Sequence, residues 1–304
     1  MCNQNCYGEV IFMISVLIPT YNYVCYKLVR DLQCQLGVCG GEYEIIVAED
    51  GSDNQETIRE NDKVTMLPGC VHLVRKENIG RAHIINYLVR EAKGEWCVIM
   101  DSDAEVVSDD YISKYTKCMA DGADVFVGDL VNPDSLPQAD ATLRYKYEKT
   151  AERFRTAEFR NRHPFERFCT FNFMARRDTL LEVPFDERCT EYGYEDTLMG
   201  LELKRHGKRV SHIDNPLRHL GFDANAVFLK KTETALHTLK KIEGSLLPYT
   251  GMGRLVLRIR KVHLTPLVKG GYKLARPLLR KNLLSDNPNL YMFSFYKLGY
   301  FLSL

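Results

Sequence analysis

An apolar run, Trp96–Met100, ends abruptly at three alternating acids, Asp101, Asp103 and Glu105. A short apolar run of this kind is typical of a buried strand. Crowded carboxylates repel one another, and burying them without a partner is costly. A metal ion, a basic side chain or water must therefore neutralise or solvate them. If the chain stays extended here, Asp101 and Asp103 face the same side and offer two hard oxygen ligands suited to Mg²⁺ or Mn²⁺.

Short apolar runs alternate with amphipathic stretches over the first hundred residues. Ile85, Leu88, Val89 and Ala92 recur at helical spacing, and Gly94 is predicted to be the C-cap of that helix. Alternation of strand and helix predicts an α/β fold with a mainly parallel sheet and right-handed crossovers. Strands are expected at residues 14–18, 43–48, 71–74, 96–100 and 210–213, and helices at residues 26–36, around 85–92, 143–159 and 193–207.

Polar clusters follow three of these expected strands. They are Thr20-Tyr21-Asn22, Asp50-Gly51-Ser52 and Asp101-Ser102-Asp103. In open parallel sheets, ligands bind beyond the carboxyl ends of the strands. Such residues also form ordinary turns. Their convergence on one edge of the sheet nevertheless predicts a ligand site there.

Composition excludes several classes of protein. The net charge of +1 over 304 residues gives no indication of a nucleic-acid partner. None of the ten cysteines forms a CxxC pair, which argues against a zinc or redox site and favours a reducing, cytosolic compartment. Residues 1–12 are expected to be an extension ahead of the first strand, and residues 13–244 the catalytic domain. The apolar stretch within residues 10–18 is too short to span a bilayer.

The C-terminal segment, residues 245–304, has a different composition. No Asp or Glu occurs from Gly244 to Ser285, while Lys, Arg and Leu alternate, and the segment ends in aromatic residues. Nucleic-acid binding, a helical extension packed on the core, and attachment to an anionic membrane surface are three possible roles. We expect a basic, amphipathic helical extension that attaches to a membrane. Pro266, Pro277 and Pro288 are predicted to break it into short pieces.

Five motifs, in this order and spacing, resemble glycosyltransferase family 2. They are SVLIPTYN (15–22), VAEDGSDN (47–54), NIGRA (78–82), GEWCVIMDSDAEV (94–106) and GYEDTLMGLELKRHG (193–207). The resemblance extends over about residues 14–242. It implies the GT-A fold and an inverting enzyme. Such an enzyme moves a sugar from a nucleoside-diphosphate donor to an acceptor hydroxyl.

The resemblance also implies a nucleotide site. Tyr21 is available to stack on the base, and Asp50 would accept a hydrogen bond from a ring N–H, which favours uracil. Arg81, in the first turn of a helix, would face the diphosphate, and Asp101 would touch the ribose or the metal. The predicted nucleotide-binding residues are Thr20, Tyr21, Asn22, Asp50, Arg81 and Asp101.

Metal-binding and catalytic residues follow from the same resemblance. Asp103 and His219 are expected to hold Mn²⁺ or Mg²⁺. The pair Glu195-Asp196 is expected to supply the catalytic base, and Asp196 is the preferred candidate. Acids at a helix start are also favoured by the helix dipole alone. Asn172 is a candidate for contact with the acceptor.

Other functions fit the sequence less well. A DxDx[TV] phosphatase motif would need Thr or Val where Glu105 stands, and sugar-nucleotide pyrophosphorylases carry a glycine-rich loop that PTYNYV (19–24) lacks. A sugar- or nucleotide-binding protein on an inactive transferase scaffold remains an alternative. The expected partners are a UDP-sugar, a glycan or lipid-linked acceptor and an anionic membrane, and no nucleic acid. The expected location is the cytoplasm, peripherally on the inner face of the cell membrane.

Overall fold

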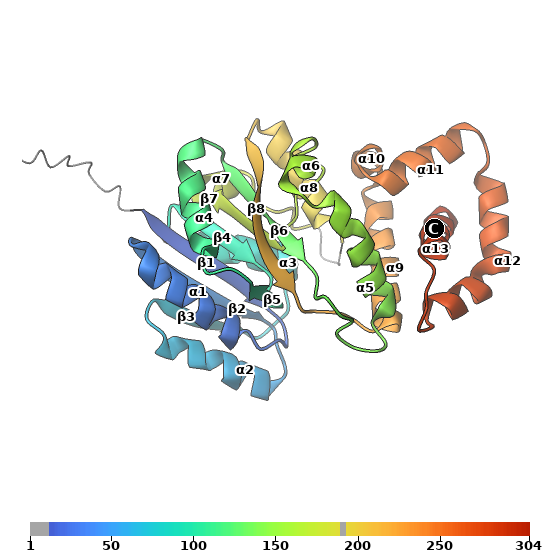
Figure 1. The fold of residues 1–304 in the computed structure, drawn as a ribbon. Coiled ribbons are helices and arrows are strands. Elements are labelled where there is room, and N and C mark those ends of the chain that lie inside the picture. Colours follow the sequence, from blue (N-terminus) through green and yellow to red (C-terminus); the bar gives the residue numbers. More distant parts are fainter. Residues whose placement is uncertain (1–11, 189–192) are drawn as a thin grey trace, which may run out of the picture.

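One mixed sheet organises the catalytic part of the molecule. The computed structural model describes residues 12–188 and 193–304, so the predicted extension at 1–12 lies almost wholly outside them. Within these residues eight strands form a sheet in the order β3-β2-β1-β4-β7-β6-β8-β5 (Figure 1). The strands are β1 Met13–Thr20, β2 Glu42–Asp50, β3 Cys70–Arg75, β4 Trp96–Met100, β5 Ala104–Val106, β6 Val125–Val131, β7 Asn172–Arg176 and β8 Val210–His219.

The half of the sheet built from β1 to β4 is parallel, as expected. β1 pairs in parallel with β2 and β4, and β2 pairs in parallel with β3. The other half is mixed, because β7 runs antiparallel to both β4 and β6, and β5 runs antiparallel to β8. The expectation of a mainly parallel sheet flanked by helices is therefore confirmed, with the direction reversing at β7.

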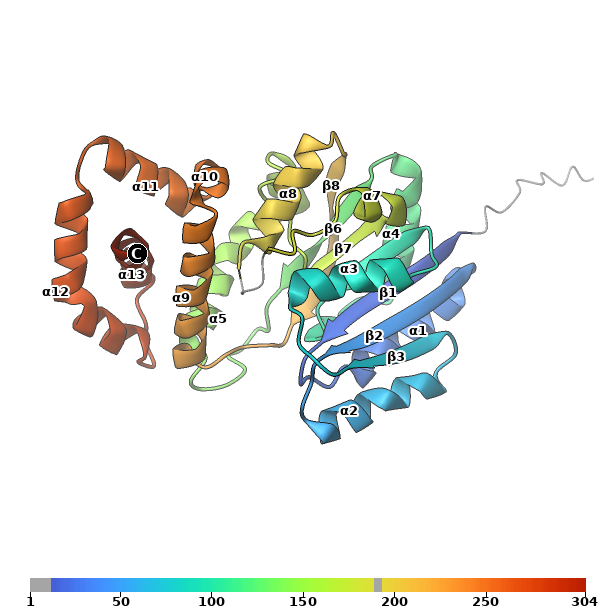
Figure 2. The same cartoon turned by 180° about the vertical axis from the view of Figure 1, so that it is seen from behind.

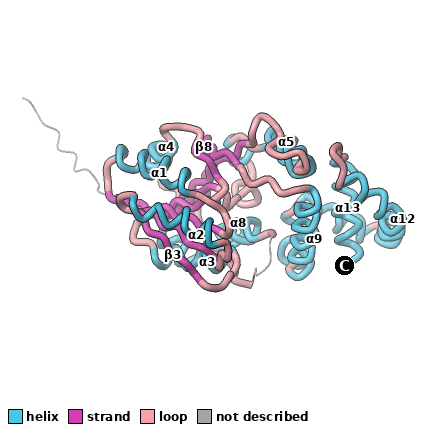
Figure 3. Tube along the Cα trace, turned by 90° about the horizontal axis from the view of Figure 1, so that it is seen from below, coloured by secondary structure: helices cyan, strands magenta, loops and turns pink. Residues whose placement is uncertain are grey.

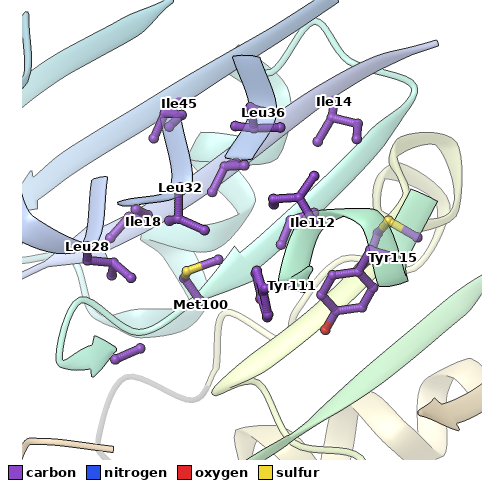
Figure 4. Packing of buried hydrophobic residues seen from close by; sticks show 14 of the residues in the cluster. Ile14, Ile18, Leu28, Leu32, Leu36, Ile45, Met100, Tyr111, Ile112 and Tyr115 are labelled. Carbon is purple, nitrogen blue, oxygen red and sulfur yellow. The ribbon is translucent and has the colours of Figure 1, made fainter. Parts of the chain in front are cut away.

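Helices cover both faces of the sheet. Leu28, Leu32 and Leu36 pack one side of α1 onto the sheet beside α4, and Figure 4 shows part of this core. On the opposite face lie α3, α7 and α8 (Figure 2). The helices of this part are α1 Tyr26–Cys39, α2 Gln55–Asp62, α3 Arg81–Glu91, α4 Tyr111–Cys118, α5 Thr142–Ala151, α6 Ala157–Asn161, α7 Arg177–Glu182, α8 Glu195–Arg205 and α9 Asn225–Lys241, with 3₁₀ turns at 63–66, 119–121 and 152–154.

Gly94 does not cap α3. The helix ends at Glu91 with Ala92 as its C-cap. A Cβ on Gly94 would lie 2.6 Å from the backbone nitrogen of Ser15, so this position needs glycine because β1 passes against it. The prediction of the cap was wrong, and the actual constraint is a tertiary contact that local sequence does not reveal.

The C-terminal helices, together with α9, form a ring around α13 (Figures 1 and 2). Figure 3 shows α13 between α9 and α12. Two apolar clusters join the C-terminal helices to α5, α8 and α9, through residues such as Leu143, Leu198 and Leu236. The hydrophobic core thus continues across the predicted boundary at residue 244. The elements are α10 Glu243–Leu246, a 3₁₀ turn at 247–249, α11 Gly251–Lys261, α12 Thr265–Leu283 and α13 Leu290–Ser303.

Two expectations for this segment need correction. α12 runs through Pro277 without a break, although Pro266 does lie in its first turn. The aromatic end is largely buried, since Phe293, Tyr296 and Phe301 are at most 1% exposed inside the ring, although Tyr291 is 87% exposed. No helix in the described part of the chain is long and apolar enough to cross a membrane.

Candidate active site

A cavity of about 830 Å³ lies at the carboxyl ends of the parallel strands. Its walls come from the loops after β1, β2 and β4, from the starts of α3 and α8, from α5 and α9, and from the end of β8. The fold thus brings together residues as distant in the sequence as Pro19 and Lys231. The predicted site residues that line this cavity are Thr20, Tyr21, Asp50, Arg81, Asp101, Asp103, Glu195, Asp196 and His219.

Asn22 is a predicted nucleotide-binding residue that does not line the cavity. It adopts a positive φ of 51°. Its Nδ2 donates to Asp53 at 2.7 Å, and its Oδ1 accepts from the backbone N–H groups of Asp53 and Asn54. The structure therefore gives Asn22 a different role, which is to tie the loop after β1 to the loop after β2.

Asn172, the predicted acceptor-binding residue, is a buried core residue. Its Oδ1 accepts from the hydroxyls of Tyr111 and Tyr115, both at 2.7 Å. Its Nδ2 donates both protons, to the carbonyls of Asp129 and Asn215, at 2.9 and 2.8 Å. All of its side-chain hydrogen-bonding groups are engaged and it is only 2% exposed. Asn172 lies outside the main cavity and lines a smaller pocket beside it.

The end of the cavity next to β1 and β2 combines an exposed ring with a buried carboxylate. Tyr21 is 52% exposed and available for stacking. Asp50 accepts from the backbone N–H groups of Ile79 and Gly80 at 2.9 and 3.0 Å, so it first orders the loop before α3. A carboxylate oxygen can accept more than one hydrogen bond, so Asp50 keeps capacity for a ligand. Gly51 permits this arrangement, because its φ is +71° and a Cβ would meet the backbone of Asn78.

Arg81 lies at the centre of the acidic groups. It is the first residue of α3, and its Nη2 pairs with Oδ1 of Asp101 and donates to Oγ1 of Thr170 at 3.0 Å. Burial opposes its charge, but Asp101, Glu195 and Asp196 outweigh that effect and raise the pKa of Arg81. For Asp101, burial is the stronger influence, and the carboxyl pKa is raised despite the guanidinium. The positive charge of Arg81 thus compensates part of the negative charge of the acids at the end of β4.

The two acids at the start of α8 have different surroundings. Oδ1 of Asp196 accepts from the hydroxyl of Thr170 at 2.5 Å and from its backbone N–H at 3.2 Å. Oε2 of Glu195 accepts from the N–H of Gly193, at 2.9 Å. Burial, reinforced by the charge of Asp196, raises the pKa of Glu195 to about 7. Asp196 is therefore the acid held by the more extensive hydrogen bonding.

Asp103 and His219 lie on the other side of the cavity. Asp101 to Asp103 form a turn rather than the extended strand that was expected. Oδ2 of Asp103 lies 3.3 Å from Nε2 of His219, and its Oδ1 is buried without a hydrogen-bond partner in the described part of the chain. A Cβ on Gly221 would come within 1.8 Å of Asp103, so the carboxylate occupies a space that glycine leaves open.

This donor set fits a hard divalent cation. Carboxylate oxygen and imidazole nitrogen suit Mn²⁺, and an unpaired buried oxygen is the signature of a missing partner. Among the described residues, no group of three or more His, Cys, Asp or Glu side chains converges to hold a metal by itself. Mg²⁺ and similar ions commonly take further ligands from substrate phosphates and water. The residues thus fit a metal whose coordination the substrate completes.

Two residues of α5 were not predicted from the sequence. Arg144 bridges Oε1 of Glu148, at 2.9 Å, and Oδ2 of Asp223, at 2.7 Å, and it also contacts His219. Oε2 of Glu148 lies 3.3 Å from Nδ1 of His219. Burial disfavours the imidazolium, but Asp103 and Glu148 outweigh it and raise the pKa of His219 to about 9. An i,i+4 Arg–Glu pair is common on helices, so the sequence held no sign that this one faces the cavity.

Comparisons with known proteins agree with this geometry. The family model described as Glycosyl transferase family 2 matches residues 15–183. A curated relative, the glycosyltransferase GlyG of Streptococcus pneumoniae serotype 4 (strain ATCC BAA-334 / TIGR4), is 35% identical over 125 residues. That match covers 40% of this chain and 40% of the relative, so it spans well under two thirds of the relative's length.

Two solved structures share the fold. The mannosyltransferase PcManGT from Pyrobaculum calidifontis, in complex with GDP-Man and Mn²⁺, superposes with a TM-score of 0.53 and 14% identity, covering 95% of this chain and 84% of its own. S. aureus TarS 1-349, in complex with UDP, gives a TM-score of 0.52 and 15% identity, covering 95% of this chain and 89% of its own. At such identities the likeness establishes the architecture alone.

Proposed function

Because this chain belongs to glycosyltransferase family 2 and has the GT-A fold, we propose that it is an inverting, metal-assisted enzyme that uses a UDP-sugar. Its being a glycosyltransferase follows from the family; the donor, the metal and the stereochemistry are our proposal. The observation that supports this proposal most strongly is that Asp103, His219, Arg81 and Asp196 all line a single cavity.

The nucleotide is proposed to lie between the loops after β1 and β2. Tyr21 would stack on the base and Asp50 would accept a hydrogen bond from a ring N–H of uracil. Arg81, at the N-terminus of α3, would face the diphosphate, where a guanidinium and free backbone N–H groups favour anions. Proteins of the same fold bind UDP, in TarS, and GDP-Man with Mn²⁺, in PcManGT.

Asp103 and His219 are the residues proposed to hold Mn²⁺ or Mg²⁺. When bound, the ion would stabilise the charge of the departing diphosphate. The buried, unpaired Oδ1 of Asp103 supports this assignment. Glu148 would orient the imidazole by accepting from Nδ1, which leaves Nε2 facing Asp103.

Asp196 is proposed as the general base. Thr170 holds one of its oxygens with two hydrogen bonds, so the carboxylate has a fixed orientation in the cavity. It would take the proton from the acceptor hydroxyl as that oxygen attacks the anomeric carbon. A positioned base of this kind contributes roughly 10²–10⁴ in rate.

A donor panel tests the proposal. The protein is incubated with UDP- and GDP-sugars, with Mn²⁺ or with EDTA, and release of the free nucleotide is measured. We expect UDP release from at least one UDP-sugar, and its loss with EDTA. Binding of UDP-sugars without any turnover, with or without candidate acceptors, would instead support the alternative of a binding protein on an inactive scaffold.

The acceptor is proposed to be a glycan or lipid-linked glycan at an anionic membrane on the inner face of the cell membrane. On α12, Leu267, Leu274 and Leu278 recur at helical spacing and are 71%, 85% and 69% exposed. The same helix has no acid and lies at the outer rim of the molecule (Figure 1). Exposed leucine beside Lys and Arg suits the interface of an anionic bilayer.

Liposome sedimentation tests this attachment. Removing residues 245–304 is unsuitable, because the apolar clusters cross residue 244. Replacing the three α12 leucines with serine should abolish binding to phosphatidylglycerol vesicles. Val38→Ser is the control, because Val38 is 87% exposed on α1. Equal sedimentation of the triple variant and the wild-type chain would exclude α12 as the attachment site.

A further inference from the structure

A second, smaller pocket of about 160 Å³ opens beside the main cavity. Leu130, Arg155, Cys169 and Phe171 line both spaces, so the two are adjacent. Cys169 immediately precedes Thr170, whose hydroxyl holds the proposed base Asp196. The small pocket therefore lies next to the point at which an acceptor hydroxyl would be deprotonated.

The charges around this pocket are strongly unbalanced. Three guanidinium groups line it, from Arg155, Arg160 and Arg167, against one carboxylate, Asp129. We call this space the arginine pocket. Asp129 lies 3.9 Å from Arg160. The nearest acid to Arg155 is Glu148, at 4.0 Å.

Arg167 is the least neutralised of the three. Its guanidinium lies over the ring of Phe159, 5.1 Å from the centroid. Within residues 12–188 and 193–304 it forms no ion pair, and its side chain is exposed. Cation–π contact leaves the N–H donors of a guanidinium available for an anion.

Arg160 forms a fixed, buried base for the pocket. It is 6% exposed and donates to the carbonyls of Arg155, Gly128 and Ile213 at 2.7, 2.6 and 3.0 Å. Burial lowers the pKa of Arg160. Burial, together with Arg160 and Arg167, also lowers the pKa of His212 to about 4. The part of the His212 shift that comes from Arg160 and Arg167 reflects the positive charge beside the pocket.

One wall of the pocket is apolar. Phe154 lines it and is 40% exposed, and its ring centroid lies 5.3 Å from that of Phe159. The guanidinium of Arg153 lies over the ring of Phe154, 4.6 Å from its centroid. A partly exposed aromatic ring beside hydrogen-bond donors can pack against a sugar ring while the anionic substituent of the sugar meets arginine.

We propose that the arginine pocket is the acceptor subsite and that it takes an acceptor with a phosphate or carboxylate near the reacting hydroxyl. This rests on the proposed function, because it takes Asp196 as the base. Guanidinium pairs carboxylate and phosphate in a bidentate fashion. A neutral acceptor would leave three arginines in the pocket with one opposing carboxylate. Leaving charges unpaired in this way costs more free energy than pairing them with an anionic acceptor.

Direct binding tests the proposal without requiring turnover. Glucose 6-phosphate, glucuronic acid and glucose are titrated calorimetrically into the full chain, with UDP and Mg²⁺ present at saturation to occupy the donor site. We expect one or both anions to bind at least about tenfold more tightly than glucose. The better anion identifies phosphate or carboxylate as the recognised group.

Matched arginine variants locate the effect. Arg167→Gln should weaken binding of the preferred anion about tenfold. Arg162→Gln should leave it unchanged, because Arg162 already pairs with Glu158 at 2.7 Å and lies outside the pocket. Equal losses in the two variants would mean a diffuse charge effect and would overturn the proposal. So would equal binding of the three compounds, including no measurable binding of any.

UDP release, measured on the same samples, separates this proposal from the proposed function. Anion binding that depends on Arg167, without UDP release from any UDP-sugar, would sustain the pocket and defeat the enzymatic proposal. UDP release from a UDP-sugar, without a preference for anions in binding, would support the enzymatic proposal and overturn the arginine pocket as a subsite for an anionic acceptor.

Discussion

Replacing Thr170 with valine should impair the proposed base while preserving the shape of the site. Thr170 is 3% exposed and links the two charged groups nearest to the chemistry. Its hydroxyl donates to Asp196 at 2.5 Å and accepts from Arg81 at 3.0 Å. Valine has nearly the same volume, so the variant removes the hydroxyl without leaving a cavity.

The expected size of the effect follows from these contacts. A hydrogen bond to a charged group contributes about 1.5–3 kcal/mol. If the bond to Asp196 orients the base, its loss lowers kcat roughly 10- to 150-fold. The backbone N–H of Thr170 still binds Asp196, at 3.2 Å, so the carboxylate stays in the cavity. Affinity for UDP should change little, because no predicted nucleotide contact is removed.

UDP release from the best UDP-sugar provides the assay, with UDP affinity measured separately by calorimetry. Thr170→Ser keeps the hydroxyl and should retain most of the activity, which separates the hydrogen bond from the packing of the methyl group. A folded Thr170→Val protein with near-normal kcat would refute the view that Thr170 positions Asp196.

The remaining predictions concern the two acids of α8 and the metal site. Asp196→Asn should retain UDP binding and lower transfer by about 10²–10⁴-fold, whereas Glu195→Gln should cost less; the reverse order in a transfer assay would mean that the base is Glu195. Gly221→Ala should displace Asp103, because a Cβ at this position would approach Asp103 to 1.8 Å, and it should therefore weaken Mn²⁺ binding measured by calorimetry. Gly37→Ala is the control, because open space surrounds Gly37 and Mn²⁺ binding should not change. Equal Mn²⁺ affinities of the two variants would contradict the proposed metal site. Because the pKa of Glu195 is about 7 in the fold against an ordinary 4.5, the folded state holds this proton more tightly than the unfolded state does, so stability falls as pH rises between these values. Glu195→Gln should lessen that fall between pH 5 and pH 8 in urea denaturation, and an unchanged pH dependence would argue against the raised pKa.

The parallel half of the sheet was predictable because its signals are local. β1, β2 and β4 are mainly apolar runs, each followed by polar residues, and the rule that such ends share one edge places Thr20, Asp50 and Asp101 together. β7 was missed because its residues, including Asn172, read as loop in isolation. Their partners, in β4 and β6, are 46 to 80 positions away.

Residues whose role depends on tertiary contact could not be identified from sequence. Thr170, Arg144 and Glu148 have ordinary neighbours along the chain, and only the fold brings them to the cavity. Pro277 illustrates the opposite error. A local rule predicted a break, but Leu279 and Leu283 of α12 pack into the ring of C-terminal helices, and the helix continues. Packing energy of that kind regularly outweighs local preference.

The anomeric configuration of the released sugar tests the central proposal most directly. A UDP-sugar with an α linkage is incubated with the protein and Mn²⁺, water serves as the acceptor, and the first-formed sugar is observed by proton NMR before mutarotation. A single displacement assisted by Asp196 predicts the β anomer. First formation of the α anomer would contradict an inverting mechanism at this site.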